Sequence, residues 1–295
     1  MKAAPAIPMT FKVQTKGPNS HVIQFNAPDK DWEQWVMLRG DVHHDSALCL
    51  RDLELQHLEM AKKRNAPIID VGDLFDVMQG KFDPRKDYKE LRPEYKVTNY
   101  LDSVLDEAEE FYGPYAENFA LIAMGNHETE LERRQGTNLT QRLVDKLRRA
   151  GSQAQAGQYT GYITFRFKVH KSVQRRIVLK YHHGMGGGSA PVTRGVIQSN
   201  RMAVMFPDAR IIVSGHNHES WSIPIAQEKI NRQLRIEKQA QWHIRVPSYK
   251  DGWRDGKGFD VEKGSPKPNG CVWLRFFIED TDDGTIGFEL TQMVR

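Results

Sequence analysis

Four apolar runs in this chain each end in a glycine that is followed by a residue able to bind a metal ion. The runs WVMLRG, PIIDVG, ALIAMG and RIIVSG lead into Asp41, Asp73, Asn126 and His216. A strand buried on both faces reads as a continuous apolar run, and ligands of open α/β sheets bind beyond the carboxyl ends of such strands. Glycine at the turn lacks the Cβ that would hinder a sharp exit from the strand. We therefore expect several strands to deliver metal ligands to one rim.

The order of the remaining patterns predicts the fold class. Helical spacing of apolar residues follows the first runs, at residues 46–64, 95–112 and 139–150, with Asp45 or Ser46 as the first N-cap. Strand and helix therefore alternate, which is typical of a largely parallel sheet. Beyond Tyr159 the strands follow one another directly, beginning with YITFRFKVH and with RRIVLKY, which ends at His182 and His183. Two stacked sheets flanked by helices would account for this order.

The domain organisation follows from the spread of the candidate ligands. They extend from Asp41 to His218, so a boundary between them would divide the site. We therefore expect one main domain over residues 31–295. Residues 1–30 contain four prolines and predict an irregular N-terminal arm or an edge strand.

Composition excludes several classes of protein. Apolar residues at 39% and charged residues at 27% are ordinary for a globular protein. The net charge of +4 arises from 42 basic against 38 acidic residues, so charge alone does not indicate nucleic acid. No apolar stretch approaches a membrane span, and Cys49 and Cys271 are expected to be small core residues. These features predict a cytoplasmic protein without membrane insertion.

Five short motifs occur in order over residues 35–220. They are Asp41-Val-His43, Gly72-Asp73-Leu-Phe-Asp76, Gly125-Asn126-His127-Glu128, His182-His183-Gly184 and Gly215-His216-Asn-His218. Each motif alone would be common by chance, but the ordered set resembles the calcineurin-like metallophosphoesterase family. That resemblance implies an α/β fold, a four-layer αββα sandwich of two mixed β-sheets flanked by helices, with a dinuclear metal centre.

The resemblance also implies a ligand set. It places Asp41, His43 and His218 on one metal ion, and Asn126, His182 and His216 on a second, with Asp73 bridging both. The neighbouring His183 remains an alternative to His182. Imidazole and oxygen donors without thiolate suit manganese, our first expectation for the two divalent ions, with iron, zinc, nickel or magnesium as alternatives.

The chemistry implied by such a centre is hydrolysis of a phosphate ester. Two divalent ions, two aspartates and a bridging hydroxide leave about one positive charge, which attracts a phosphate. A single in-line attack by that hydroxide on phosphorus would follow. His127 would then stabilise or protonate the leaving oxygen, with Asp73 as the bridging ligand and Asp76 and Glu128 in supporting positions.

The substrate remains open at this point. We expect a phosphodiesterase acting on a phosphate ester, nucleotide or other small diester. The GDLFD and H-H-G motifs are also similar to those of the Mre11/SbcD nucleases, and residues 81–96 and 246–258 mix basic with aromatic residues, so DNA cleavage is the alternative. A non-catalytic, metal-stabilised scaffold is a third reading. The sequence indicates no particular protein partner.

Overall fold

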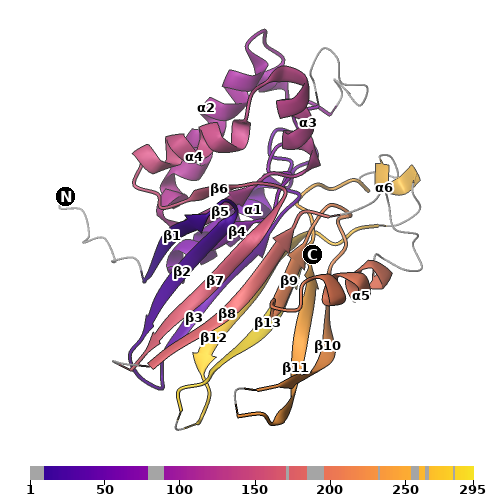
Figure 1. Cartoon of the computed structure of the whole chain (residues 1–295). Coiled ribbons are helices and arrows are strands. Elements are labelled where there is room, and N and C mark those ends of the chain that lie inside the picture. Colours follow the sequence, from indigo (N-terminus) through magenta and orange to yellow (C-terminus); the bar gives the residue numbers. More distant parts are fainter. Residues whose placement is uncertain are drawn as a thin grey trace, which may run out of the picture.

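The computed structural model of the chain contains two β-sheets packed face to face, with helices on the outside (Figure 1). It describes residues 10–78, 90–170, 173–184, 196–231, 233–253, 259–262, 266–281 and 283–295. The larger sheet has the order β1 (Phe11–Gly17), β2 (Ser20–Ala27), β7 (Thr160–Val169), β8 (Val173–His182), β9 (Ile211–Ser214), β11 (Ile236–Arg245) and β10 (Trp221–Ile230). The smaller sheet has the order β13 (Ile286–Val294), β12 (Gly270–Ile278), β3 (Glu33–Arg39), β4 (Ile68–Asp70), β5 (Phe119–Ala123) and β6 (Gln155–Gly157).

Parallel pairing dominates around the strands that carry the candidate ligands. Strands β3, β4, β5 and β6 pair in parallel in the smaller sheet, and β8, β9 and β11 do so in the larger one. Antiparallel hairpins complete both sheets, so both are mixed. The carboxyl ends of the ligand-bearing strands therefore gather at one end of the sandwich.

The inner faces of the two sheets form an aromatic core. Side chains alternate between buried and half-buried along β7, as expected for a strand with one face turned inward. Phe25, Phe165, Phe167 and Phe276 meet there, with 4.8 Å between the ring centroids of Phe165 and Phe276. Because β1 and β2 contribute to this core, residues 11–27 of the segment expected as an arm or edge strand form an edge hairpin of the larger sheet.

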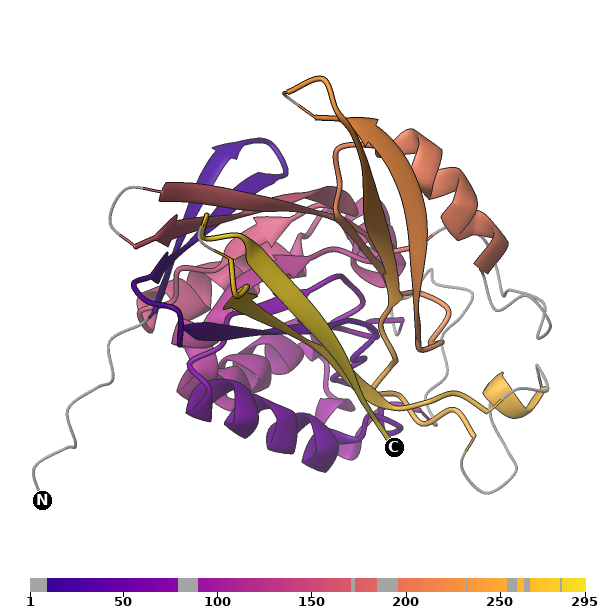
Figure 2. The same cartoon turned by 90° about the horizontal axis from the view of Figure 1, so that it is seen from below.

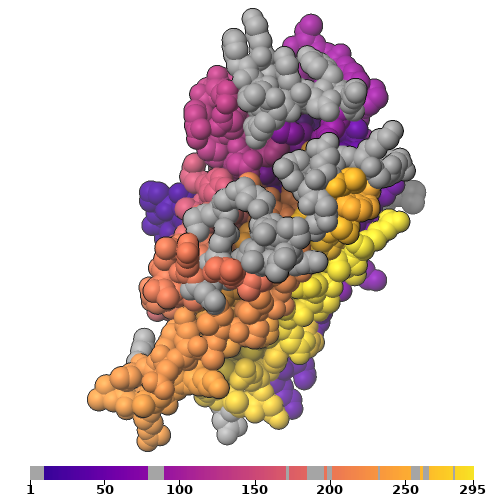
Figure 3. All heavy atoms as spheres, turned by 90° about the vertical axis from the view of Figure 1, so that its right-hand side faces the viewer, coloured from indigo at the N-terminus to yellow at the C-terminus, as the bar shows by residue number. Residues whose placement is uncertain are grey.

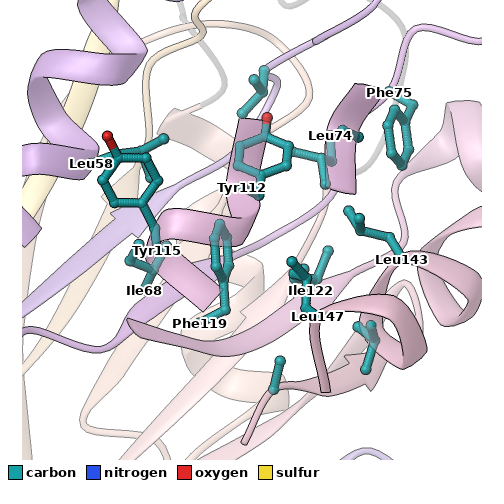
Figure 4. Close-up of a cluster of buried hydrophobic side chains, with 14 of the residues drawn as sticks. Leu58, Ile68, Leu74, Phe75, Tyr112, Tyr115, Phe119, Ile122, Leu143 and Leu147 are labelled. Carbon is teal, nitrogen blue, oxygen red and sulfur yellow. The ribbon is translucent and has the colours of Figure 1, made fainter. Parts of the chain in front are cut away.

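Helices cover the outer face of the smaller sheet. The helices α1 (Arg51–Lys63), α2 (Tyr100–Tyr112) and α4 (Leu139–Arg149), with the 3₁₀ turn η2 (Gly113–Asn118), pack their inner faces into this second core (Figure 4). Leu139, Leu143 and Leu147 recur at the helical spacing that turns one face of α4 inward. Tyr112 meets Phe119 edge to face at 5.5 Å between ring centroids. Burial of these side chains holds α1, α2 and α4 against the sheet.

The predicted α/β sandwich of two mixed sheets is confirmed. Helix α5 (Val196–Met205) lies on the larger sheet and buries Met202 against Ile212 of β9, which gives the fourth layer. Figure 2 shows the two sheets with helices on opposite sides. Short elements complete the chain, namely η1 (Pro93–Tyr95), α3 (Asn126–Gln135) and α6 (Phe259–Glu262).

Some local expectations differ from the structure. Helix α1 begins at Arg51 with Leu50 as its N-cap, so neither Asp45 nor Ser46 caps it. Cys49 therefore precedes the helix instead of lying in it. Both cysteines are buried and free. In the part of the chain that the structure describes, no helix is long and apolar enough to cross a membrane.

Candidate metal centre

The first group of candidate ligands joins the two sheets. Asp41 and His43 follow β3 of the smaller sheet, whereas His218 follows β9 of the larger one. The Nε2 atoms of His43 and His218 are 3.3 Å apart, and Nε2 of His218 is 3.8 Å from Oδ1 of Asp41. One ligand atom from each residue lies within 4.8 Å of the others. These are the three residues expected on one metal ion.

The second group lies directly beside the first. Asp73, His183 and His216 each offer a ligand atom within 4.8 Å of the other two. Oδ1 of Asn126 is 3.0 Å from Nε2 of His183 and 2.7 Å from Nδ1 of His216. Nε2 of His183 is 3.1 Å from Asp73 and 3.9 Å from Asp41, so the groups share one buried space.

The structure places His183, and not the preferred His182, in this group. Nδ1 of His183 donates to the carbonyl oxygen of Val71 at 3.1 Å, which leaves Nε2 facing Asp73 and Asn126. His182 points elsewhere because successive side chains of an extended strand point to opposite faces. Burial lowers the pKa of His182 to about 4, and no candidate ligand group among the described residues includes it. The geometry therefore favours His183, the alternative, as the candidate ligand.

The candidate ligands themselves make the sharp turns. Asp41, His43, Asp73, His216 and His218 have φ angles of 51°, 52°, 54°, 78° and 57°. Apart from glycine, aspartate, asparagine and histidine are the residue types that enter this left-handed region most readily. Such backbone strain persists only where the surroundings enforce it, and it gathers at functional sites.

Gly72, with a φ of 113°, makes the turn expected of a motif glycine, whereas Gly125 and Gly215 allow a close approach by other residues. A Cβ atom on Gly125 would lie 2.0 Å from Oδ1 of Asp73, and one on Gly215 would lie 2.4 Å from Oδ2 of Asp41. Both positions need glycine because another loop passes too close for any side chain. The motifs can converge because Gly125 and Gly215 leave room for the carboxylates of Asp73 and Asp41.

Glu128 fastens two of these loops together. Its carboxylate accepts hydrogen bonds from the backbone N–H groups of Gly125, Phe75 and Asp73 at 2.8, 2.9 and 3.2 Å. Burial, together with the nearby Asp73, raises the pKa of Glu128 to about 8. Glu128 therefore supports the site by holding the backbone of these loops. It does not orient His127, which is held by Asp76.

Asp76 serves both His43 and His127. Its Oδ1 is 2.8 Å from Nδ1 of His43, and that contact turns Nε2 of His43 toward His218. Its carbonyl oxygen accepts a hydrogen bond from Nδ1 of His127 at 2.6 Å. Nε2 of His127 then lies 3.7 Å from Oδ2 of Asp73. Lys250 pairs with the same Asp76 carboxylate at 3.1 Å.

Asp45 is a functional candidate that sequence reasoning missed. It is buried, and its two carboxylate oxygens accept the backbone N–H groups of Asp76 and Val77 at 2.6 and 3.0 Å. The hydroxyl of Tyr100 in α2 donates to the same carboxylate at 2.5 Å. Asp45 therefore holds the loop between Asp73 and Val77 in place. Its position two residues after the first motif was the available signal.

Comparison with known proteins finds only solved structures of low sequence identity. No protein-family model and no curated protein matches the chain. A metallophosphoesterase from Sphaerobacter thermophilus is 13% identical with a TM-score of 0.36, and the match covers 88% of this chain and 89% of that one.

Two further solved structures have a similar fold. GAP50, described as the anchor in the inner membrane complex of Plasmodium, is 12% identical with a TM-score of 0.46, covering 88% of this chain and 84% of that one. Vps29 from Entamoeba histolytica, solved with Zn²⁺, is 11% identical with a TM-score of 0.37, covering 88% and 98%.

The electrostatics of the two groups fit divalent cations. Burial, with the neighbouring Asp73, raises the pKa of Asp41 to about 7, and its Oδ1 has no hydrogen-bond partner among the described residues. Burial alone would lower the pKa of His183, but Asp73 and Asp41 raise it to about 9. Carboxylate and imidazole donors packed this closely, without thiolate, suit transition-metal ions or magnesium. The residues present therefore fit the metal centre that the motifs imply.

The adjacent histidines provide a matched pair of variants. We expect His183→Ala to lower the affinity for manganese by 100-fold or more, because it removes a buried candidate ligand. His182→Ala should change that affinity by less than about threefold. Isothermal titration of the metal-stripped variants measures both. Equal losses in the two variants would contradict the placement of His183.

Asp45→Asn tests the support of the Asp73–Val77 loop. The asparagine has one oxygen to accept hydrogen bonds where Asp45 has two, so one backbone N–H of the loop loses its acceptor. We therefore expect about 10- to 100-fold weaker metal binding. Asp52→Asn, at an exposed position of α1, is the control and should leave the affinity unchanged. An unaltered affinity in Asp45→Asn would show that the loop needs no such anchor.

Metal binding should also release protons. The raised pKa of His183 means that its imidazole is protonated below about pH 9 in the metal-free protein, whereas a metal ion binds the neutral form. We therefore expect the affinity to rise with pH between 6 and 8, by about tenfold per pH unit for each proton displaced. Titrations in buffers of different ionisation enthalpy count the protons. A pH-independent affinity would contradict this assignment.

Proposed function

We propose that this chain is a metal-dependent phosphoester hydrolase that acts on a phosphodiester. The observation that carries this proposal is the convergence of two ligand groups, one with Asp41, His43 and His218 and the other with Asp73, His183 and His216. Asn126 completes the second group. Two bound divalent ions would supply hydroxide at neutral pH and neutralise the charge of a phosphate. Manganese is proposed first, with iron, zinc, nickel or magnesium as alternatives.

His127 is the residue proposed to act on the leaving oxygen. Its Nδ1–H group is held by the carbonyl oxygen of Asp76, so Nε2 faces the space beside Asp73. The side chain is 11% exposed, which leaves it accessible from the substrate side. A protonated Nε2 in this position can donate to the oxygen that departs from phosphorus.

The nuclease alternative draws no support from the described part of residues 81–96. Tyr95 is buried, and its hydroxyl bonds with Arg51 and Glu107, so its ring is not available for stacking on a base. Arg92 donates to the carbonyl oxygen of Ser46. Residues 81–89, which include Lys81, Arg85, Lys86 and Tyr88, lie outside the described residues. We therefore propose a small diester as the substrate and treat cleavage of DNA in the Mre11/SbcD manner as a second outcome.

The decisive experiment compares three variants on four substrates. Metal-stripped protein is reloaded with manganese and assayed on a chromogenic phosphodiester, the matching monoester, and single- and double-stranded DNA. Asp73→Asn should abolish activity. His127→Asn should lower kcat by about 10²- to 10⁴-fold while metal content is retained. His170→Asn is the control, since His170 is an exposed histidine in the turn after β7.

Each result has a definite meaning. Turnover of the small diester, lost in Asp73→Asn and retained in His170→Asn, supports the proposal. DNA cleavage that weakens steeply with salt would favour the nuclease instead. Metal binding without turnover of any substrate would favour the non-catalytic scaffold.

A further inference from the structure

The larger sheet is interrupted in its middle. Strand β9 has four residues, whereas its neighbours β8 and β11 have ten each. It pairs only with the last part of β8, from Leu179, and the last part of β11, from Trp242. Among the described residues, no strand pairs with the remaining inner edges of β8 and β11. Figure 1 shows these two strands diverging from the start of β9.

The divergence opens a slot at the end of β9 opposite to the metal centre. A cavity of about 910 Å³ lies there, with β8 and β11 as its walls and β13 as its floor. Its lining includes Arg176 and Val178 on one wall, Lys238 and Trp242 on the other, and Ile286 and Phe288 below. We name this space the β8–β11 slot. The candidate metal ligands follow the opposite ends of these strands, so the slot is a separate site.

The walls of the slot are strand edges with free hydrogen-bonding capacity. Arg210 closes its upper end, where its N–H donates to Val178 at 2.8 Å and its carbonyl oxygen accepts from Trp242 at 2.9 Å. The guanidinium of Arg210 also donates to the carbonyl oxygen of Ala240. Beyond this point, every second residue of each wall turns its N–H and C=O toward the slot. Such edges are templates for a further strand.

The floor of the slot carries the apolar side chains of Ile286 and Phe288 beside the polar Glu279 and Thr285. The rings of Trp242 and Phe288 meet edge to face at 6.3 Å between centroids, and Ile286 is only half-buried. At the tip of the β10–β11 hairpin, Ile230, Leu234 and Ile236 are 71%, 85% and 72% exposed, and Lys238 of β11 lies between this tip and Trp242. This hairpin projects from the body of the molecule (Figure 3). Side chains of a strand in the slot that point inward would meet this floor.

The charges around the slot do not favour a polyanion. Its lining contains four basic residues and three acidic ones, namely Arg175, Arg176, Arg210, Lys238, Asp208, Glu237 and Glu279. Nucleic acid is bound mainly through an excess of basic residues and has no backbone amides to offer a strand edge. A peptide of little net charge fits this balanced lining, and its backbone amides can pair with a strand edge.

We propose that the β8–β11 slot binds an extended peptide segment of a partner protein. The segment adds a strand to β8 or β11 and continues the line of β9 away from Arg210. Every second side chain is apolar and packs on Trp242 and Phe288, while the others face solvent beside Arg176 and Glu237. Backbone hydrogen bonds supply affinity and the aromatic floor supplies selectivity, as in other cases of strand addition.

The test begins with a selection for such peptides. A phage-displayed library of eight-residue peptides, with an apolar residue at every second position, is selected on the immobilised full chain. The strongest peptide is synthesised with a fluorescein label and titrated by fluorescence anisotropy. Its twin carries N-methyl groups on alternate amides, which removes hydrogen-bond donors from one edge and preserves the side chains. We expect the twin to bind at least tenfold more weakly.

Variants of the protein locate the peptide. Trp242→Ala should weaken binding at least tenfold, whereas Trp253→Ala, a 40%-exposed tryptophan of another segment, should not. Amide hydrogen exchange should slow in residues 173–178 or 236–241 when the peptide is bound. Asp73→Asn should bind the peptide as the wild type does, so the result is independent of hydrolysis. Thermal melting shows whether Trp242→Ala is folded, and the N-methylated twin needs no variant.

Several results would overturn the proposal. They are the recovery of no peptide above background, equal binding of the N-methylated twin, and protection of amides outside the slot. A dimer in solution whose formation slows exchange in the same residues would make a second copy of this chain the occupant. That outcome would replace the partner peptide.

Discussion

Burial of carboxyl groups at the meeting point of two sheets is the constraint on which the site depends. Asp41, Asp73 and Glu128 are all removed from water, and an isolated carboxylate in such a place is strongly unfavourable. Backbone donors offset part of this cost, since the N–H of His216 reaches Asp41 at 2.7 Å and that of His127 reaches Asp73 at 2.9 Å. The loops must approach closely to provide these donors, and bound cations would neutralise the charge that remains.

A second buried network connects this site to the helical layer. Arg39 at the end of β3 pairs with Glu54 of α1 at 2.7 Å and with Asp70 of β4 at 2.9 Å. Asp70 in turn accepts the N–H of Gly72, immediately before Asp73. Because a buried ion pair is costly to break, the position of α1 and that of the Asp73 loop depend on each other. Packing in the second core thus helps to set the geometry of the site.

Sequence patterns predicted the strand ends better than the details between them. Runs such as PIIDVG show that Asp73 follows a buried strand, because burial on both faces leaves a continuous apolar signature. The choice between His182 and His183 depends on which face of β8 is turned inward at its last residue, and two adjacent histidines carry no signal for that. The role of Asp45 depends on a loop 31 residues later in the chain. The β8–β11 slot likewise depends on the relative lengths of β8, β9 and β11.

The left-handed backbone of five candidate ligands has a consequence for how such a site can change by mutation. Aspartate, asparagine and histidine adopt this conformation at little cost, whereas a β-branched or bulky residue does not. An alanine at Asp41 or His216 would therefore disturb the main chain as well as remove a ligand atom. Exchanges among these three residue types alter the donor atoms and spare the turn. Such substitutions can change which metal ion the site prefers, or abolish metal binding, while the turns and the surrounding fold are kept.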